Sequence, residues 1–243
     1  MGLSTRAYQR MDAATFRAPS GAGTPSARLR RKIGLVSGAF AEACYGVFRH
    51  PRLDEVWTDY LVTQHTILRA TVPLMTAGRD EARARASTDR VAAGVADYLD
   101  VHLVEETDHD EWLLEDLEVL GVPRSTALAR VPSATVAALV GSQYYWVLHV
   151  DPIAVLGYLA ALERDPPSSD FIEELIRRTG HDRAAFRTLI AHAERDPEHA
   201  DELDELLDHI ELTGTQWELV SLSALSTVQM LARVLRELVG ASR

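Results

Sequence analysis

Cysteine is almost absent from this 243-residue sequence, which contains only Cys44. A single thiol cannot form a disulfide within the chain, and it cannot build a cluster of thiolate ligands. A metal site in this protein would therefore have to use nitrogen and oxygen donors. Because a chain without disulfides is typical of a reducing compartment, we expect a cytoplasmic protein.

Signals for export or membrane insertion are also missing. The N-terminus is polar and basic and lacks the apolar stretch of a secretory signal. The longest uncharged run, residues 131–150, is long enough to cross a bilayer, but it contains Pro132, Gln143 and His149, which are costly in lipid. We expect a buried core helix there and no membrane partner.

Basic residues are outnumbered, with 25 Lys and Arg against 36 Asp and Glu, so the net charge is −11. This charge repels phosphate backbones, and nucleic acid is not an expected partner. The basic residues gather near the start, where residues 1–32 hold seven of them against Asp12 alone. Together with the turn-forming run PSGAGTPS, this predicts a flexible basic segment over 1–26, or a docking arm, ahead of a helical domain over 27–243.

Alternating strand patterns are lacking, whereas apolar residues recur at helical spacing almost everywhere after residue 27. The sequence predicts an all-α protein whose short links favour one bundle of helices packed side by side. Apolar helices can also bury a dimer interface, so a homodimer is possible. The predicted helices cover residues 27–48, 53–77, 81–119, 133–149, 151–164, 169–179, 182–195, 197–211 and 214–239.

Histidines and carboxylates supply the candidate chemistry. With nine His and 36 Asp and Glu, a carboxylate three positions before a histidine should occur about 1.3 times by chance, and it occurs twice. The spacing alone is therefore not specific. The pair Glu106 and His109 gains weight from its context, because leucines such as Leu103 and Leu113 would line one helix face and turn the pair inward.

The second pair belongs to the run HAERDPEH, in which His192, Asp196 and His199 would share one stripe of a helix. Pro197 disfavours a continuous helix at Asp196, so the helix is expected to kink or restart there. Asp196 is then either a potential ligand or simply the N-cap of a new helix.

A third candidate is Glu163, at the end of the apolar run IAVLGYLAALE, where it is either a solvent-facing end or a ligand. Mixed imidazole and carboxylate donors without sulfur suit iron or manganese, and helical bundles build dinuclear sites from facing helices. The candidate ligands are Glu106, His109, Glu163, His192, Asp196 and His199.

The motifs EExxHDEWLLEDLExLG, LGYLAALE and HAERDPEHADEL occur in that order along the chain. This succession resembles the haem-oxygenase-like di-iron oxidases and oxygenases, which share their fold with thiaminase II and pyrroloquinoline quinone synthase. The similarity spans roughly residues 45–237 and begins with HPRLDEVWTDYLVTQH. It implies a single-domain haem-oxygenase-like helical bundle.

The resemblance also implies a site and a reaction. Glu106, His109, Glu163, His192, Asp196 and His199 match the ligands of two Fe(II) ions per chain, although Glu105 could replace Glu106. The ions would activate O2, with electrons from an external donor, and oxidise a small organic substrate such as a fatty acid or an amino acid.

Two other functions stay open at this point. One is a metal-free enzyme like thiaminase II or the quinone synthase, but thiaminase II-like enzymes take a cysteine nucleophile from the middle of the chain, and Cys44 lies near the beginning. The other is a metal-dependent binding or scaffold module. Beside the six candidates, His102 could be an extra ligand or a supporting donor, and Asp116 could orient His109 or simply pack.

Overall fold

Helices account for all the regular secondary structure in the part of the chain that the computed structural model describes, residues 23–164 and 166–241. No β-strand occurs in these ranges, so the predicted all-α fold is confirmed. The elements are α2 (Pro25–Phe48), α3 (Leu53–Arg85), α4 (Arg90–Glu105), α5 (His109–Val119), α6 (Arg124–Ala129), α7 (Ala134–His149), α8 (Ala154–Leu162), α9 (Ser169–Thr179), the 3-10 helix η1 (Arg183–Phe186), α10 (Arg187–His209) and α11 (Gly214–Ala241).

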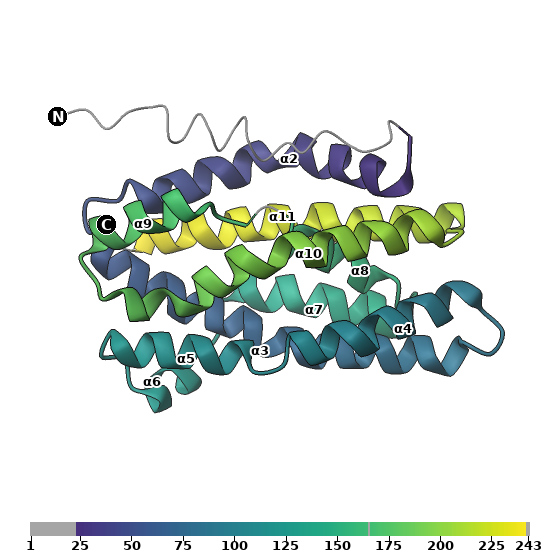
Figure 1. Cartoon of the computed structure of the whole chain (residues 1–243), viewed down its shortest axis with the longest axis horizontal. Coiled ribbons are helices and arrows are strands. Elements are labelled where there is room, and N and C mark those ends of the chain that lie inside the picture. Colours follow the sequence, from purple (N-terminus) through teal and green to yellow (C-terminus); the bar gives the residue numbers. More distant parts are fainter. Residues whose placement is uncertain (1–22, 165, 242–243) are drawn as a thin grey trace.

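The long helices run along the long axis of the bundle, and α4 and α5 follow one another along one side (Figure 1). The largest cluster of buried apolar side chains draws on α2, α3, α4, α7, α8, α10 and α11. The side chains of this cluster surround α8, a short helix whose residues Ala154–Leu159 are all buried. The core therefore places the C-terminal end of α8 in the interior of the bundle.

Helix α11 is the one helix in the described residues that is long and apolar enough to cross a membrane. Most of this apolar stretch is buried, and α11 packs mainly against α2, α8 and α7. In this structure it is a central core helix of the bundle, as Figure 1 shows in yellow.

Two predicted helix breaks are wrong. Helix α3 continues through Gly78, where an added Cβ would contact Val155 Cγ1 at 3.4 Å and Leu99 Cδ1 at 3.6 Å. The glycine thus allows close packing instead of ending the helix. Helix α10 likewise continues through Pro197, so Asp196 lies within a helix and is not an N-cap.

The predicted helix 81–119 in fact covers the end of α3 and two further helices. Helix α3 extends to Arg85, α4 begins after the N-cap Asp89, and the chain leaves the helical path between Glu105 and His109. Asp108 adopts a left-handed conformation with φ of 69°, which ends the helical hydrogen-bond pattern there. The apolar periodicity on both sides of this break concealed it.

The start of the helical domain also differs slightly from the predicted residue 27. Helix α2 begins at Pro25, because Thr24 caps it by accepting a hydrogen bond from the Ala27 amide, and Pro25 suits the first helical position. Ser26 is held by Asp208 of α10 through two hydrogen bonds. The rest of the predicted basic segment, residues 1–22, lies outside the described residues. The short helix α6 lies outside the predicted helices.

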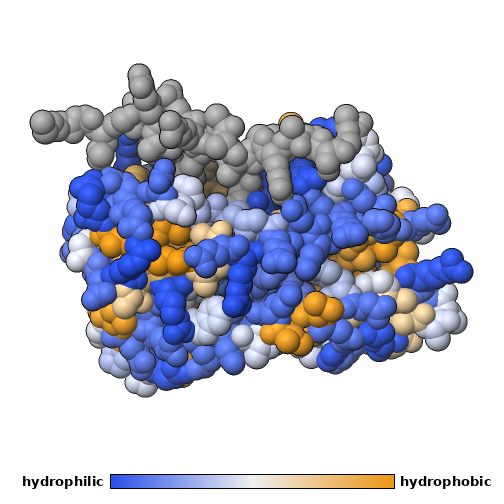
Figure 2. Space-filling model, in the orientation of Figure 1, coloured by the Kyte–Doolittle hydropathy of each residue, from blue (hydrophilic) through white to orange (hydrophobic). Residues whose placement is uncertain are grey.

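The face of the molecule in Figure 2 is mostly hydrophilic and carries separate hydrophobic patches. The most exposed large apolar side chains are Leu35 at 86%, Val131 at 82% and Val104 at 76% exposure. They come from three different helices or links, and the homodimer stays a prediction.

Gly157 offers a test of the packing that positions α8. A Cβ there would overlap the backbone oxygen of Val220 and would lie 2.8 Å from Ser223 Cβ. We expect Gly157→Ala to lower the free energy of unfolding by about 1–3 kcal/mol, because α8 and α11 must move apart. Urea denaturation followed by circular dichroism measures this change.

The matched control is Gly141→Ala in α7, where a Cβ would meet nothing within 4 Å. This change should stabilise the protein by about 0.5–1 kcal/mol through the better helix propensity of alanine. Equal effects of the two substitutions would contradict the close approach of α8 and α11.

Candidate metal centre

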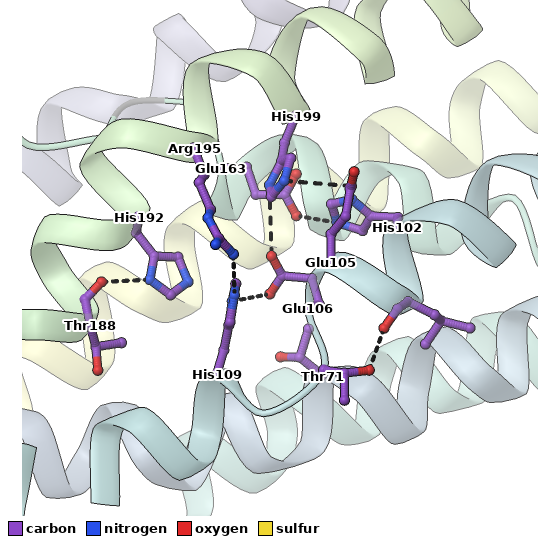
Figure 3. Close-up of polar contacts among 12 residues, drawn as sticks. Thr71, His102, Glu105, Glu106, His109, Glu163, Thr188, His192, Arg195 and His199 are labelled. Atoms are coloured by element: carbon purple, nitrogen blue, oxygen red, sulfur yellow. Dashed lines mark hydrogen bonds and ion pairs between the residues drawn. The ribbon is translucent and has the colours of Figure 1, made fainter. Parts of the chain in front are cut away.

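The candidate ligands come from four helices, and Figure 3 shows Glu106, His109, Glu163, His192 and His199 together in the interior of the bundle. Helix α4 and the turn after it bring Glu105 and Glu106, and the start of α5 brings His109. Glu163 caps the C-terminal end of α8. Helix α10 contributes its residues from successive turns: His192, Asp196 and His199.

The break between α4 and α5 shapes the first group of donors. Glu106 is the C-cap of α4 and His109 is the first residue of α5, so they do not share one regular helix. Their side chains nevertheless meet, with Glu106 Oε2 and His109 Nδ1 3.0 Å apart. The left-handed Asp108 turns the chain so that both side chains point inward.

His192 completes this group from α10. The potential ligand atoms of Glu106, His109 and His192 all lie within 4.8 Å of one another. The Nδ1–H of His192 donates to the backbone oxygen of Thr188 at 2.8 Å, because a carbonyl can only accept. This hydrogen bond fixes the tautomer and leaves Nε2 of His192 free to bind a metal ion.

A second group lies beside the first and consists of His102, Glu105 and His199, again with their ligand atoms within 4.8 Å of one another. Glu163 joins it through a 3.0 Å contact between its Oε1 and His102 Nε2. Glu106 lies between the two groups, because its second oxygen, Oε1, is 3.7 Å from His199 Nδ1.

Asp196 is 6% exposed, and its Oδ1 has no hydrogen-bond partner. Burial, with the carboxylates of Glu163 and Glu106 nearby, raises the pKa of Asp196 to about 8. Without a cation this carboxylate is therefore poorly tolerated in its ionised form. It belongs to neither three-residue group, although its charge is coupled to both.

The pKa values of His102 and Glu106 also reflect both burial and the charges close to them. Burial alone would lower the pKa of His102, but the hydrogen bond and charge of Glu163, followed by the charge of Glu106, raise it overall. Burial would raise the pKa of Glu106, but the hydrogen bond and charge of His109 and the charge of His192 lower it overall. The carboxylates and imidazoles thus stabilise one another only in part.

The fit of a metal ion can be judged from the donor atoms that lack partners. Buried polar atoms are almost always hydrogen-bonded in proteins, and each exception costs about 1–3 kcal/mol. Six such exceptions gather here, all oxygen or imidazole nitrogen, which are donors that suit iron or manganese. They are His102 Nδ1, Glu105 Oε2, Glu106 Oε1, Glu163 Oε2, Asp196 Oδ1 and His199 Nδ1.

The structure brings all six predicted residues into this region. It also brings in His102, which the sequence predicts as an extra ligand or a supporting donor, and Glu105, which the sequence offers as a replacement for Glu106. Asp116 does not orient His109; it is 1% exposed and accepts a hydrogen bond from the Thr188 amide at 2.9 Å, near the start of α10. Arg195 also reaches the site, with Nη1 3.4 Å from His109 Nε2, and nothing in the motif spacing indicated it.

Solved structures that align with this chain show that it has a haem oxygenase-like fold. A solved domain of unknown function with this fold from Shewanella denitrificans aligns with a TM-score of 0.77 at 17% identity, over 88% of this chain and 92% of that one. A TenA homologue from Pseudomonas syringae pv. tomato gives 0.65 at 12% identity, over 87% and 92%. A CADD-like protein of unknown function from Nostoc punctiforme gives 0.60 at 14% identity, over 88% and 96%.

The sequence comparison is more specific. Residues 67–232 match the profile of the family described as iron-containing redox enzymes, and the chain belongs to that family. The resemblance inferred from the motifs is therefore confirmed at the level of the family and the fold. No curated protein matches the sequence.

The raised pKa of Asp196 predicts how the metal-free protein responds to pH. Between about pH 4 and pH 8 the unfolded chain carries Asp196 ionised while the folded protein keeps the proton, so the stability contributed by Asp196 falls as the pH rises. We expect Asp196→Asn to remove this loss. In chelator-treated protein, the melting temperature of the variant minus that of the wild type should increase as the pH rises from about 5 to about 8.

Asp59→Asn on the exposed face of α3 is the control, and its melting curve should follow the wild type at every pH. If the difference between the melting temperatures of Asp196→Asn and the wild type stayed constant from about pH 5 to about pH 8, the raised pKa of Asp196 would be contradicted.

Proposed function

We propose that this protein is a non-haem di-iron oxidase or oxygenase that uses O2 to oxidise a small organic substrate. The observation that carries the proposal is the cluster of six buried donor atoms without hydrogen-bond partners, in a chain of the iron-containing redox enzyme family. Two ferrous ions bound there would supply the electrons that reduce O2.

Glu106, His109 and His192 would hold one ion, while His199, Glu163 and Asp196 would serve the other. The carboxylates neutralise the cations, and the imidazoles complete the ligand set without adding charge. Thr188 keeps the His192 ring in its tautomer, and Asp116 fixes the start of the same helix through the Thr188 amide. These contacts hold the ligands of α10 in place before an ion arrives.

A carboxylate-bearing substrate, such as a fatty acid or an amino acid, would find a cationic group at this site. Arg195 lies against His109, and its guanidinium also stands over the ring of Trp112 at 5.3 Å. The residue itself is exposed, so its charge can attract an anion from solvent and orient it toward the ligands.

The thiaminase-like alternative requires a reactive thiol, and Cys44 is poorly suited to that role. It lies on α2 and packs with apolar side chains of α2, α3 and α11. Burial raises the pKa of its thiol to about 12, so the nucleophilic thiolate is strongly disfavoured. Cys44 therefore supports a packing role and leaves the metal-dependent function as the better proposal.

The proposal is tested by anaerobic Fe(II) titration of metal-free protein. We expect about two Fe(II) per chain by calorimetry and metal analysis. Glu106→Ala should abolish most of this binding because its two oxygens face both groups of donors, and His192→Ala should lose the ion of its own group. Wild-type protein loaded with Fe(II) should then consume O2 faster than the same Fe(II) in buffer.

Cys44→Ala serves as the control for the alternative. It should retain the Fe(II) stoichiometry and the O2 consumption of the wild type. Wild-type protein that binds no Fe(II), or Glu106→Ala and His192→Ala proteins that each still bind two Fe(II) per chain, would refute the proposed function.

A further inference from the structure

The last turn of α4 carries two polar side chains that the six predicted ligands leave unexplained. His102 is completely buried, and its Nδ1 has no hydrogen-bond partner. Glu105 is about one-third exposed, yet its Oε2 is buried and also lacks a partner. Leaving an imidazole nitrogen and a carboxylate oxygen unsatisfied in the same place is costly unless something binds them.

The spacing of these atoms matches ligands of a common ion. Glu105 Oε2 lies 3.7 Å from His102 Nδ1 and 3.6 Å from His199 Nε2. Both distances are too long for hydrogen bonds. Two donors each about 2.1 Å from one ion, at a tetrahedral angle, lie about 3.4 Å apart. Glu105 Oε2 could therefore share an ion with either histidine, and the potential ligand atoms of all three residues lie within 4.8 Å of one another.

The ring of His102 is already oriented for this role. Its Nε2 lies 3.0 Å from Oε1 of Glu163, and the tautomer that donates this hydrogen to the carboxylate has its lone pair on Nδ1, which faces Glu105. Metal-binding histidines usually donate their other nitrogen to a carboxylate in this way. The ring also stacks on Tyr98, with centroids 5.2 Å apart, which holds its plane (Figure 3 shows His102 and Glu163).

We propose that His102 and Glu105 are themselves metal ligands, which close one ion position together with His199. The other position is formed by Glu106, His109 and His192, and Glu106 lies between the two. Glu105 and Glu106 then serve different ions and are not alternatives. Glu163 supports His102 through Oε1 and keeps Oε2, which has no partner, for the ion. This assignment rests on the proposed function, because it requires that the centre binds metal.

The test is the metal stoichiometry of His102→Gln and Glu105→Gln. Metal-free proteins are titrated anaerobically with Fe(II), and separately with Co(II), whose visible absorption reports its ligands. The wild type should bind two ions per chain. Each variant should keep one ion at the wild-type affinity and bind the other at least about tenfold more weakly. The Co(II) absorption should fall correspondingly, by about half.

His149→Gln and Glu42→Gln make the same chemical changes at exposed positions of α7 and α2 and should bind two ions. Circular dichroism checks the folding of each variant. If His102→Gln does not fold, Glu105→Gln decides the question, since that side chain is partly exposed and glutamine has nearly the same size and shape.

The possible failures are distinguishable. Two ions in both variants, with unchanged affinity and an unchanged Co(II) spectrum, would overturn the role of His102 and Glu105 and leave the proposed function standing. Loss of one ion in the variants, in a wild-type protein that loads two Fe(II) but does not consume O2, would support this ligand set and count against the oxidase. A wild type that binds neither metal would overturn both.

Discussion

The organising constraint in this protein is negative charge held inside a helical bundle without enough hydrogen bonds. Glu106, Glu163 and Asp196 are each less than one-tenth exposed, and each leaves an oxygen without a partner. Removing a carboxylate from water is expensive unless a cation or a full set of donors replaces the solvent. The imidazoles nearby replace it only in part, so a bound cation would stabilise these carboxylates.

The surrounding fold holds these groups in place despite the free-energy cost of burying carboxylates. Residues Ala154–Leu159 of the short helix α8 are all buried, and the helix fits closely against α11 at Gly157, which fixes the position of its end. Asp116 and Thr188 tie α5 to the first turn of α10. The apolar core supplies the stability that the polar centre does not, a division typical of sites that are preorganised for a ligand.

The sequence was sufficient to predict the all-α fold and the residues that meet at its centre, because apolar periodicity and the order of the motifs can both be read directly from the linear sequence. It was insufficient wherever a local preference competes with packing. Gly78 and Pro197 usually interrupt helices, but here the neighbouring helices hold the chain in helical form. Conversely, the break at Asp108 lies within a periodic apolar pattern and was not seen.

The same limit applies to His102 and Glu105. Their spacing from Glu106 was visible, but a residue's role as a donor depends on which atoms remain without partners after folding. That depends on contacts with α8 and α10, more than fifty residues away in the chain, such as the one between His102 and Glu163. No pattern within α4 alone contains this information.

The proline in α10 has a mechanical consequence. Because Pro197 has no amide hydrogen, the backbone oxygen of Ala193 does not receive the usual bond from the following turn. One hydrogen bond is therefore missing from the helix between His192 and His199, the two imidazoles that belong to different groups of donors, and helices bend most easily at such positions. Bending at this position would change the separation of the two imidazoles, so the two groups of donors could adjust to each other without unfolding of the helix.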